Sequence, residues 1–263
     1  FEHRKAWVEK RLHQLTEVFS MDICSYAIMS NHIHVILKVK TEEISKLSDD
    51  EVLITWHKIY KGNILCQKYL QGEMLDELEL ESVKETVVAL RKRMINISWF
   101  MRALNEPIAR RANQEDSCTG KFWEGRFKSQ PLLDEAALLT CMAYVDLNPV
   151  RANITKTLET SEFTSIKYRI AAFMQGKQPA HLMKFKEPQK LPAPDALDFY
   201  LKDYLQLVEE TGKIIRKDKK GALSSSSLSV LNKLNLQQDS WVKITSEFCD
   251  LFKNNPAGNE QSL

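Results

Sequence analysis

A β-hairpin near the start of the chain places the firmest limit on its fold. Residues 23–29 and 32–39 are two largely apolar runs of strand-forming type, separated only by the polar pair Ser30-Asn31. A short polar break between two such runs is typical of a tight turn that joins antiparallel strands. We therefore expect an antiparallel sheet, to which the other segments of the chain add helices.

The second strand of this hairpin carries two histidines at strand spacing. Alternate side chains of a strand share a face, so we expect His32, His34 and Ile36 on one side and the intervening apolar residues on the core side. Two imidazoles roughly 7 Å apart along a strand (two rises of about 3.3 Å) can converge on one divalent cation. A lone His-x-His pair is a loose pattern, and histidines that bind no metal are the competing interpretation.

A strong helical pattern over residues 132–147 carries a tyrosine and leads to an asparagine. Its first turn is acidic, and Pro149 is expected to stop it. Tyr144 and Asn148 are four residues apart and so share one helical face. Tyr144 is either a core or rim aromatic or a nucleophile. Asn148 is either a helix-ending residue or a metal ligand.

The rest of the chain divides by periodicity and composition. Helical spacing is predicted at residues 7–19, 47–90 (acidic, with a break near 61–63), 96–113 (with Pro107 inside) and 197–215, with a short strand at 126–131. We expect a domain over residues 1–183 with a helical insertion at 41–95, a linker at 184–194 within a helical extension over 184–253, and a disordered tail at 254–263. The chain opens at Phe1 inside a helical pattern, which suggests that sequence is missing upstream.

Charge and cysteine content restrict the class of protein. The net charge is only +2, yet the segment from Lys84 to Lys128 holds ten Lys or Arg and five Asp or Glu, while residues 42–81 are acidic. This segregation permits a basic face for phosphates, although an ordinary solvated helix face fits it as well. The five scattered cysteines form no Cys-x-x-Cys pair, which argues against a zinc knuckle and for a reducing cytoplasm. No apolar run reaches membrane-spanning length, so no membrane partner is expected.

Three segments in a fixed order carry a family resemblance. They are residues 29–37 (MSNHIHVIL), 120–128 (GKFWEGRFK) and 144–152 (YVDLNPVRA). Together they resemble the single-tyrosine HUH transposases, and within them the REP-associated tyrosine transposases of bacteria. The likeness covers about residues 7–154, apart from the insertion-like stretch, and ends before about residue 185. It implies an α+β fold of ferredoxin or RRM type, with helices packed on one face of an antiparallel sheet of four to five strands. The family's strand before the first helix is missing here.

The resemblance also implies a site and a reaction. His32 and His34 match the family's metal pair, Asn148 matches its amide ligand, and Tyr144 matches its nucleophile, with Mg²⁺ or Mn²⁺ as the metal. The expected reaction cleaves and rejoins single-stranded or hairpin DNA through a 5′-phosphotyrosine link and a free 3′-OH, as in DNA transposition. The relatives are typically monomers that act in cis. Our expected DNA contacts are Lys121, Arg126, Lys128 and Arg151 on phosphates and Phe122 on bases. For Phe122 and Trp123 alike, the alternative is that the aromatic ring anchors its loop in the core, and this alternative is favoured for Trp123.

Two other functions remain open from the sequence. One is a catalytically inactive or domesticated relative that binds hairpin DNA. The other is a metal-dependent hydrolase that uses water as its nucleophile and leaves Tyr144 without a role. A phenol has a pKa near 10, so the tyrosine needs help to lose its proton. No single residue in the sequence identifies itself as that base.

Overall fold

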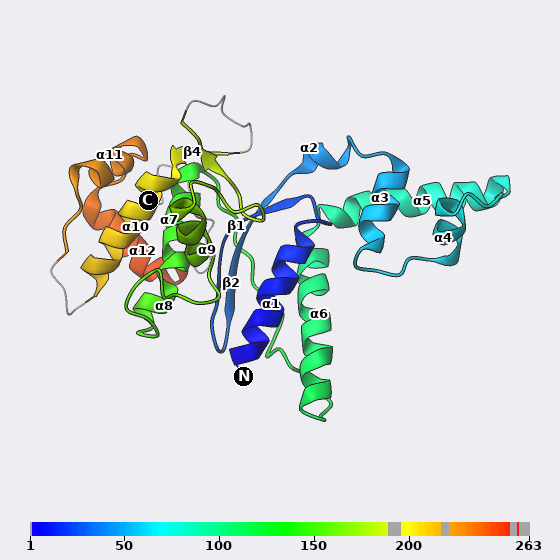
Figure 1. The fold of residues 1–263 in the computed structure, drawn as a ribbon, viewed down its shortest axis with the longest axis horizontal. Coiled ribbons are helices and arrows are strands. Elements are labelled where there is room, and N and C mark those ends of the chain that lie inside the picture. Colours follow the sequence, from blue (N-terminus) through cyan, green and yellow to red (C-terminus); the bar gives the residue numbers. More distant parts are fainter. Residues whose placement is uncertain (1, 189–195, 217–220, 253–256, 258–263) are drawn as a thin grey trace. The chain divides into compact units, whose positions relative to one another are not determined.

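The structure is a computed structural model that describes residues 2–188, 196–216, 221–252 and 257, and it divides into two compact units (Figure 1). Unit 1 contains residues 23–37 and 128–263, and unit 2 contains residues 2–22 and 38–127. The tail predicted at 254–263 lies outside the described residues apart from Ala257, and so does the part of the predicted linker from residue 189 onward.

The predicted hairpin is present. Strand β1 (Met21–Ile28) pairs with β2 (Ile33–Val39), and the Met29 N–H donates to the His32 carbonyl at 2.9 Å across the turn. The other edge of β1 is covered too, because Met183 N donates to the Ile23 carbonyl at 2.8 Å and Ile28 N donates to the Phe163 carbonyl at 3.0 Å. This double coverage explains why β1 is buried along nearly its whole length while β2 is mostly half-buried.

The fold is α+β, but its sheets are smaller than predicted. Within the described residues two two-stranded sheets replace the expected antiparallel sheet of four to five strands. The second sheet pairs β3 (Phe185–Lys186) with β4 (Leu197–Tyr200) in parallel. The strand predicted at residues 126–131 is wrong, because that segment has no regular structure. Phe127 is 37% exposed there, so the alternation buries no continuous apolar face.

Six helices complete the described part of unit 1. They are α7 (Glu135–Asp146), α8 (Asn148–Arg151), α9 (Ser165–Met174), α10 (Leu201–Ile215), α11 (Ser225–Lys233) and α12 (Gln238–Leu251). The Asp134 carboxylate caps α7 by accepting from Ala137 N at 2.7 Å. Pro149 ends α7 as expected, yet it also starts the short α8, because proline fits the first turn of a helix.

The helix predicted at 197–215 begins four residues late. Residues 197–200 form β4 because their burial alternates: Leu197 and Phe199 are buried, while Asp198 and Tyr200 are exposed. From Leu201 the burial follows helical spacing, and α10 packs with α7, α9 and α12 around one core. Trp241 of α12 is fully buried in that core, and its indole N–H donates to the Thr211 hydroxyl at 2.8 Å.

Unit 2 is helical. It holds α1 (Glu2–Leu15), α2 (Thr41–Ile44), α3 (Asp49–His57), α4 (Ile64–Leu70), α5 (Glu77–Met94) and α6 (Ile97–Glu115). The break predicted near residues 61–63 is confirmed, since the Asn63 side chain caps α4 by accepting from Cys66 N at 2.8 Å. Two capping boxes, Ser48 with Glu51 and Asp76 with Glu79, start α3 and α5. No helix in the described part of the chain is both long and apolar enough to cross a membrane.

Helices α1 and α6 lie side by side in unit 2 (Figure 1). Pro107 stands inside α6 without breaking it. A proline has no N–H, so it leaves the carbonyl four residues earlier, that of Ala103, without its helical donor. Arg11 of α1 supplies the replacement, because its Nε donates to the Ala103 carbonyl at 3.0 Å.

Candidate active site

The centre of the predicted site assembles within unit 1. The Tyr144 ring, on α7, meets the His34 ring edge-on, with 5.7 Å between centroids and 80° between planes. The His34 ring in turn meets the His32 ring at 4.8 Å and 78°. The structure thus brings together a tyrosine and two imidazoles from segments that are far apart in the sequence.

The one buried residue of β2 is Ile36, on the histidine side, contrary to the expectation that the intervening residues face the core. Ile36, which shares a face with His34, is 7% exposed and belongs to the same core cluster as Leu139 and Met142 of α7. The intervening residues, expected in the core, are only half-buried. The physical reason is that α7 packs on this side at Ile36 and His34, while His32 stays exposed.

A neighbouring amide orients the more exposed of the two imidazoles. The Nδ1 of His32 lies 2.7 Å from the Asn31 side-chain oxygen. With Nδ1 as the donor in this hydrogen bond, Nε2 keeps its lone pair for a ligand. The turn residue that joins the strands therefore also fixes the ring that follows it.

Both imidazoles are held in their neutral form. Burial, and after it the nearby His32 and Arg151, lower the pKa of His34 to about 4. Burial and the Arg151 charge also lower the pKa of His32. Neutral imidazoles have lone pairs to offer, so the two rings are ready to bind a cation near neutral pH.

We expect metal-free protein to lose stability as the pH falls from 6.5 to about 4 because of His34. In this pH window the imidazole is protonated in the unfolded chain but stays neutral in the folded chain. Protonation therefore favours unfolding by up to roughly 3 kcal/mol. Urea unfolding in a chelator should show this slope in the wild type and lose it in His34→Gln. The variant His181→Gln, which removes an exposed imidazole, should keep the slope. Equal slopes in His34→Gln and the wild type would contradict the assignment.

Residues of α12 and α8 make contacts with Tyr144 that the sequence did not predict. The Phe248 ring lies 5.8 Å from the Tyr144 ring, and Cys249 is close enough to the phenol to raise its pKa. The Arg151 guanidinium lies 3.7 Å from the centre of the Tyr144 ring and donates to the Thr245 carbonyl at 2.8 Å. Apolar spacing along α12 could have predicted the helix, but nothing in it indicates the face of the tyrosine as the partner.

These contacts act on the phenol in opposite directions. Burial, and after it Cys249, raise the pKa of Tyr144 to about 12, although the nearby Arg151 acts to lower it. Among the described side chains, Arg151 is therefore the group placed to stabilise a phenolate. Its guanidinium lies over the ring of the predicted nucleophile.

Asn148 offers a buried amide one turn after Tyr144. It is 6% exposed at the start of α8, and its carboxamide makes no hydrogen bond to the described residues. No group of three or more His, Cys, Asp or Glu side chains is placed to hold a metal in the described part of the chain, and a set of two imidazoles and one amide is not of that kind. The described ring contacts join the imidazoles to each other and to Tyr144, and the part of Asn148 in a cation site stays a prediction.

The predicted DNA contacts fall in both units. Lys128 and Arg151 belong to unit 1 with Tyr144, whereas Lys121, Phe122 and Arg126 belong to unit 2. Lys121, Arg126 and Lys128 are exposed, as phosphate contacts require. Arg151 is instead engaged with Tyr144 and a carbonyl.

The two aromatic residues of the glycine-flanked loop have different partners. The Trp123 indole N–H donates to the Asn105 carbonyl at 3.0 Å, which fits its interpretation as a loop anchor. Phe122 is half-buried, with its ring 4.9 Å from the Trp123 ring and 6.0 Å from the Arg4 guanidinium. Its role as a stacking surface for bases stays a prediction.

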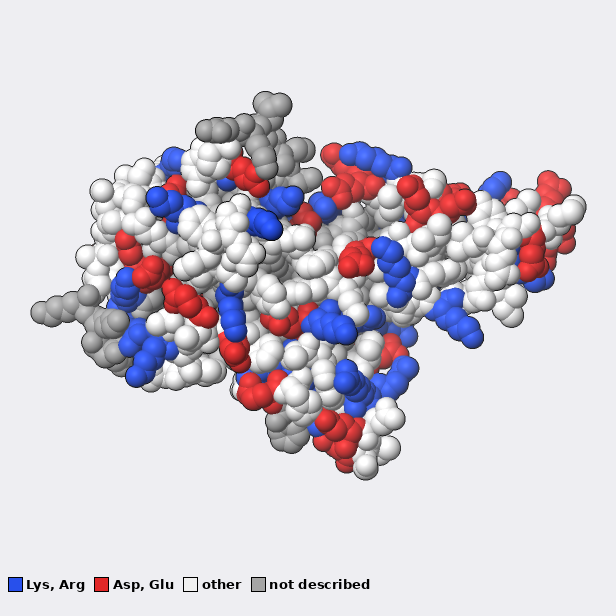
Figure 2. Space-filling view, viewed as in Figure 1, with Lys and Arg blue, Asp and Glu red and all other residues white. Residues whose placement is uncertain are grey.

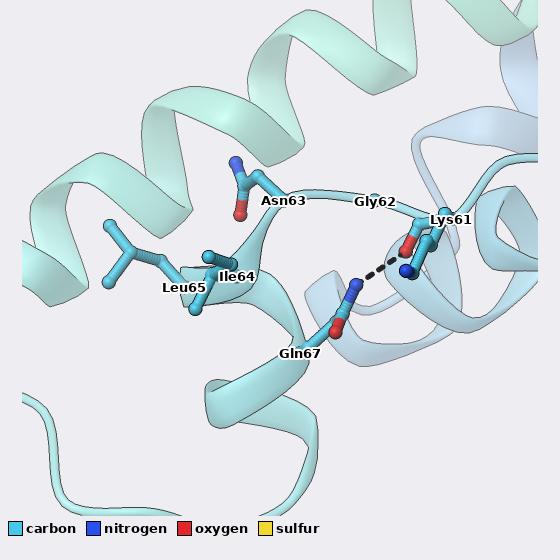
Figure 3. A pocket seen from close by; sticks show the side chains of 6 residues that line it. All are labelled: Lys61, Gly62, Asn63, Ile64, Leu65 and Gln67. Carbon is cyan, nitrogen blue, oxygen red and sulfur yellow. Dashed lines mark hydrogen bonds between the residues drawn. The ribbon is translucent and has the colours of Figure 1, made fainter.

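Other surface features do not add to this site. Figure 2 shows basic and acidic side chains interspersed over the visible face, with acids gathered where α5 begins. An open pocket in unit 2 is lined by Lys61, Gly62, Asn63, Ile64, Leu65 and Gln67, and Gln67 Nε2 donates to the Lys61 carbonyl at 2.8 Å (Figure 3). Its lining includes none of the predicted site residues.

Comparison with known proteins adds no assignment. No protein-family model, curated protein or solved structure matches the chain. The function is therefore inferred from the motifs of the sequence and from the geometry of the Tyr144 site.

Proposed function

We propose that the protein is a DNA strand transferase that cleaves and rejoins single-stranded or hairpin DNA through a tyrosine, as in the REP-associated tyrosine transposases. The observation that carries this proposal is the edge-on contact of the Tyr144 and His34 rings at 5.7 Å, with His32 beside them. A tyrosine next to two neutral imidazoles combines a nucleophile with ligands for a cation. Neither feature has this meaning alone.

His32, His34 and Asn148 would hold the divalent cation. When bound, Mg²⁺ or Mn²⁺ polarises the scissile phosphate and neutralises part of its charge. Two features of the chain favour cation binding by the histidines: Asn31 orients the His32 ring, and burial keeps His34 neutral. These features are properties of the protein itself.

The chemical step exchanges one ester bond for another. A bond forms between the Tyr144 oxygen and phosphorus, the bond from phosphorus to the 3′ oxygen breaks, and that oxygen leaves as a 3′-OH after it takes a proton. The phenol proton passes to solvent water before or during the attack, and the Arg151 guanidinium stabilises the resulting charge. The phosphotyrosine conserves the bond for rejoining, so no nucleotide cofactor is needed.

Exposed basic residues would guide the substrate. Lys121, Arg126 and Lys128 contact phosphates in this proposal, and Phe122 stacks on an unpaired base. The monomeric, cis-acting state of the relatives is also part of the proposal.

The experiment is covalent trapping. Full-length protein is incubated with a labelled single-stranded oligonucleotide that carries a hairpin, and with Mn²⁺, then denatured and run on a gel. We expect a labelled band at the mass of protein plus DNA fragment, absent when EDTA is added. Tight DNA binding with no such band across a panel of hairpins would favour a binding protein without catalysis.

A further inference from the structure

A buried carboxylate stands between the two predicted site residues of the tyrosine segment. Asp146 is the last residue of α7, two positions after Tyr144 and two before Asn148, and it is fully buried. Its Oδ1 accepts from the hydroxyls of Ser25 at 2.9 Å and Ser165 at 2.7 Å. Its Oδ2 accepts from the Tyr204 hydroxyl at 2.5 Å. A buried charge requires such partners, so their positions constrain the carboxylate.

The hydrogen-bond partners of Asp146 belong to three different elements. Ser25 belongs to β1, which pairs with the histidine-bearing β2. Ser165 starts α9, and its Oγ also accepts from Tyr26 N of β1 at 2.9 Å. Tyr204 belongs to α10, which carries none of the proposed site residues. The carboxylate thus ties the tyrosine helix to the sheet on one side and to a supporting helix on the other.

A buried arginine strengthens the link to the sheet. Arg169 is fully buried, with 0% of its surface exposed. Its guanidinium donates to the carbonyls of Cys24 on β1 at 2.9 Å and Met183 at 3.0 Å. Burial raises the pKa of the Asp146 carboxyl, and the Arg169 charge is among the influences that oppose this rise. Ser25 therefore makes the direct hydrogen bond between Asp146 and β1, while Arg169 is hydrogen-bonded to the same strand and acts on Asp146 only through its charge.

We propose that Asp146 is a positioning residue, which through Ser25 sets the tyrosine helix against the histidine strand so that Tyr144 meets His34. Its importance for the reaction rests on the proposed function. The placement itself is a property of the protein without metal or DNA. A small shift of a nucleophile costs a large factor in rate, so the link matters more for the reaction than its share of stability indicates.

Two single-hydroxyl deletions separate positioning from mere stability. Ser25→Ala and Tyr204→Phe each remove one hydroxyl that donates to Asp146, but only the first cuts the direct link to β1. Substituting Asp146 itself is less useful, because it leaves Arg169 as an unbalanced buried charge. The stability of both variants is recorded by urea unfolding.

The first measurement uses metal-free, DNA-free protein. Nuclear Overhauser cross-peaks between the ring protons of Tyr144 and His34 report the contact directly. We expect them to weaken in Ser25→Ala and to keep their wild-type intensity in Tyr204→Phe. Equal intensities in the two variants would overturn the proposal, whether or not the protein turns out to cleave DNA.

The second measurement is the rate of covalent adduct formation at saturating hairpin DNA. We expect Ser25→Ala to be at least about tenfold slower than the wild type with unchanged DNA affinity, and Tyr204→Phe to be near the wild type even where it loses more stability. Rates that follow stability in both variants would show a purely structural role. A wild type that forms no adduct contradicts the proposed function, while the ring contacts still decide the positioning claim.

Discussion

Replacing Tyr144 by phenylalanine should abolish covalent capture of DNA while leaving DNA binding intact. The substitution removes one oxygen and keeps the ring that packs on His34, Phe248 and Arg151. Fold and affinity should therefore be preserved. The lost oxygen is the atom that bonds to phosphorus, so we expect adduct formation to fall by at least about 1,000-fold. The measurement is the covalent trapping assay together with a binding titration on the same labelled hairpin.

A matched tyrosine makes the Tyr144 result specific. Tyr168→Phe changes a 42% exposed tyrosine on α9 of the same unit, and it should trap DNA as the wild type does. If Tyr144→Phe still cut the strand and released a free phosphate end, water would be the nucleophile. That result would move the protein to the class of metal-dependent hydrolases.

Replacing His34 by alanine should have the second largest effect. The substitution removes a predicted ligand and the ring against which Tyr144 packs, while His32 stays exposed next to its Asn31 partner. We expect adduct formation to fall by about 100-fold or more, because charge stabilisation by a bound cation contributes several kcal/mol to such a reaction. Raising the Mn²⁺ concentration should restore part of the rate.

The metal dependence is the informative readout for His34. Titrating Mn²⁺ against the adduct rate should show a weaker apparent affinity in His34→Ala and no change in His181→Ala, which removes an exposed imidazole of the same unit. An equal loss of rate at every Mn²⁺ concentration, without a shift in the midpoint, would mean that His34 only supports the tyrosine.

The sequence predicted the parts of the site whose signals are local. The polar break at Ser30-Asn31 indicated the hairpin, strand spacing placed His32 and His34 together, and the apolar run before Tyr144 indicated its helix. Each of these signals depends on neighbours within one turn or one strand. The meeting of the Tyr144 and His34 rings followed from the combination of motifs rather than from any spacing.

The features that the sequence did not reveal are contacts between distant segments. The surroundings of Tyr144 on α12, at Phe248 and Cys249, come from residues about a hundred positions later, and no periodic pattern specifies such a pairing. The burial of the Ile36 face was misassigned for the same reason, since α7 decides which side of β2 is covered. Local patterns also failed at residues 197–200. Their composition suits a helix, but they form β4 and pair with β3.

The proline inside α6 has a consequence for how this helix pair can vary. Arg11 supplies to the Ala103 carbonyl the hydrogen-bond donor that Pro107 lacks, so positions 11 and 107 together determine whether this carbonyl is satisfied. A chain with alanine at 107 would satisfy that carbonyl within its own helix and would free position 11 for other side chains. Among any descendants of this protein, residues 11 and 107 should therefore change as a pair, with the arginine kept only where the proline is kept.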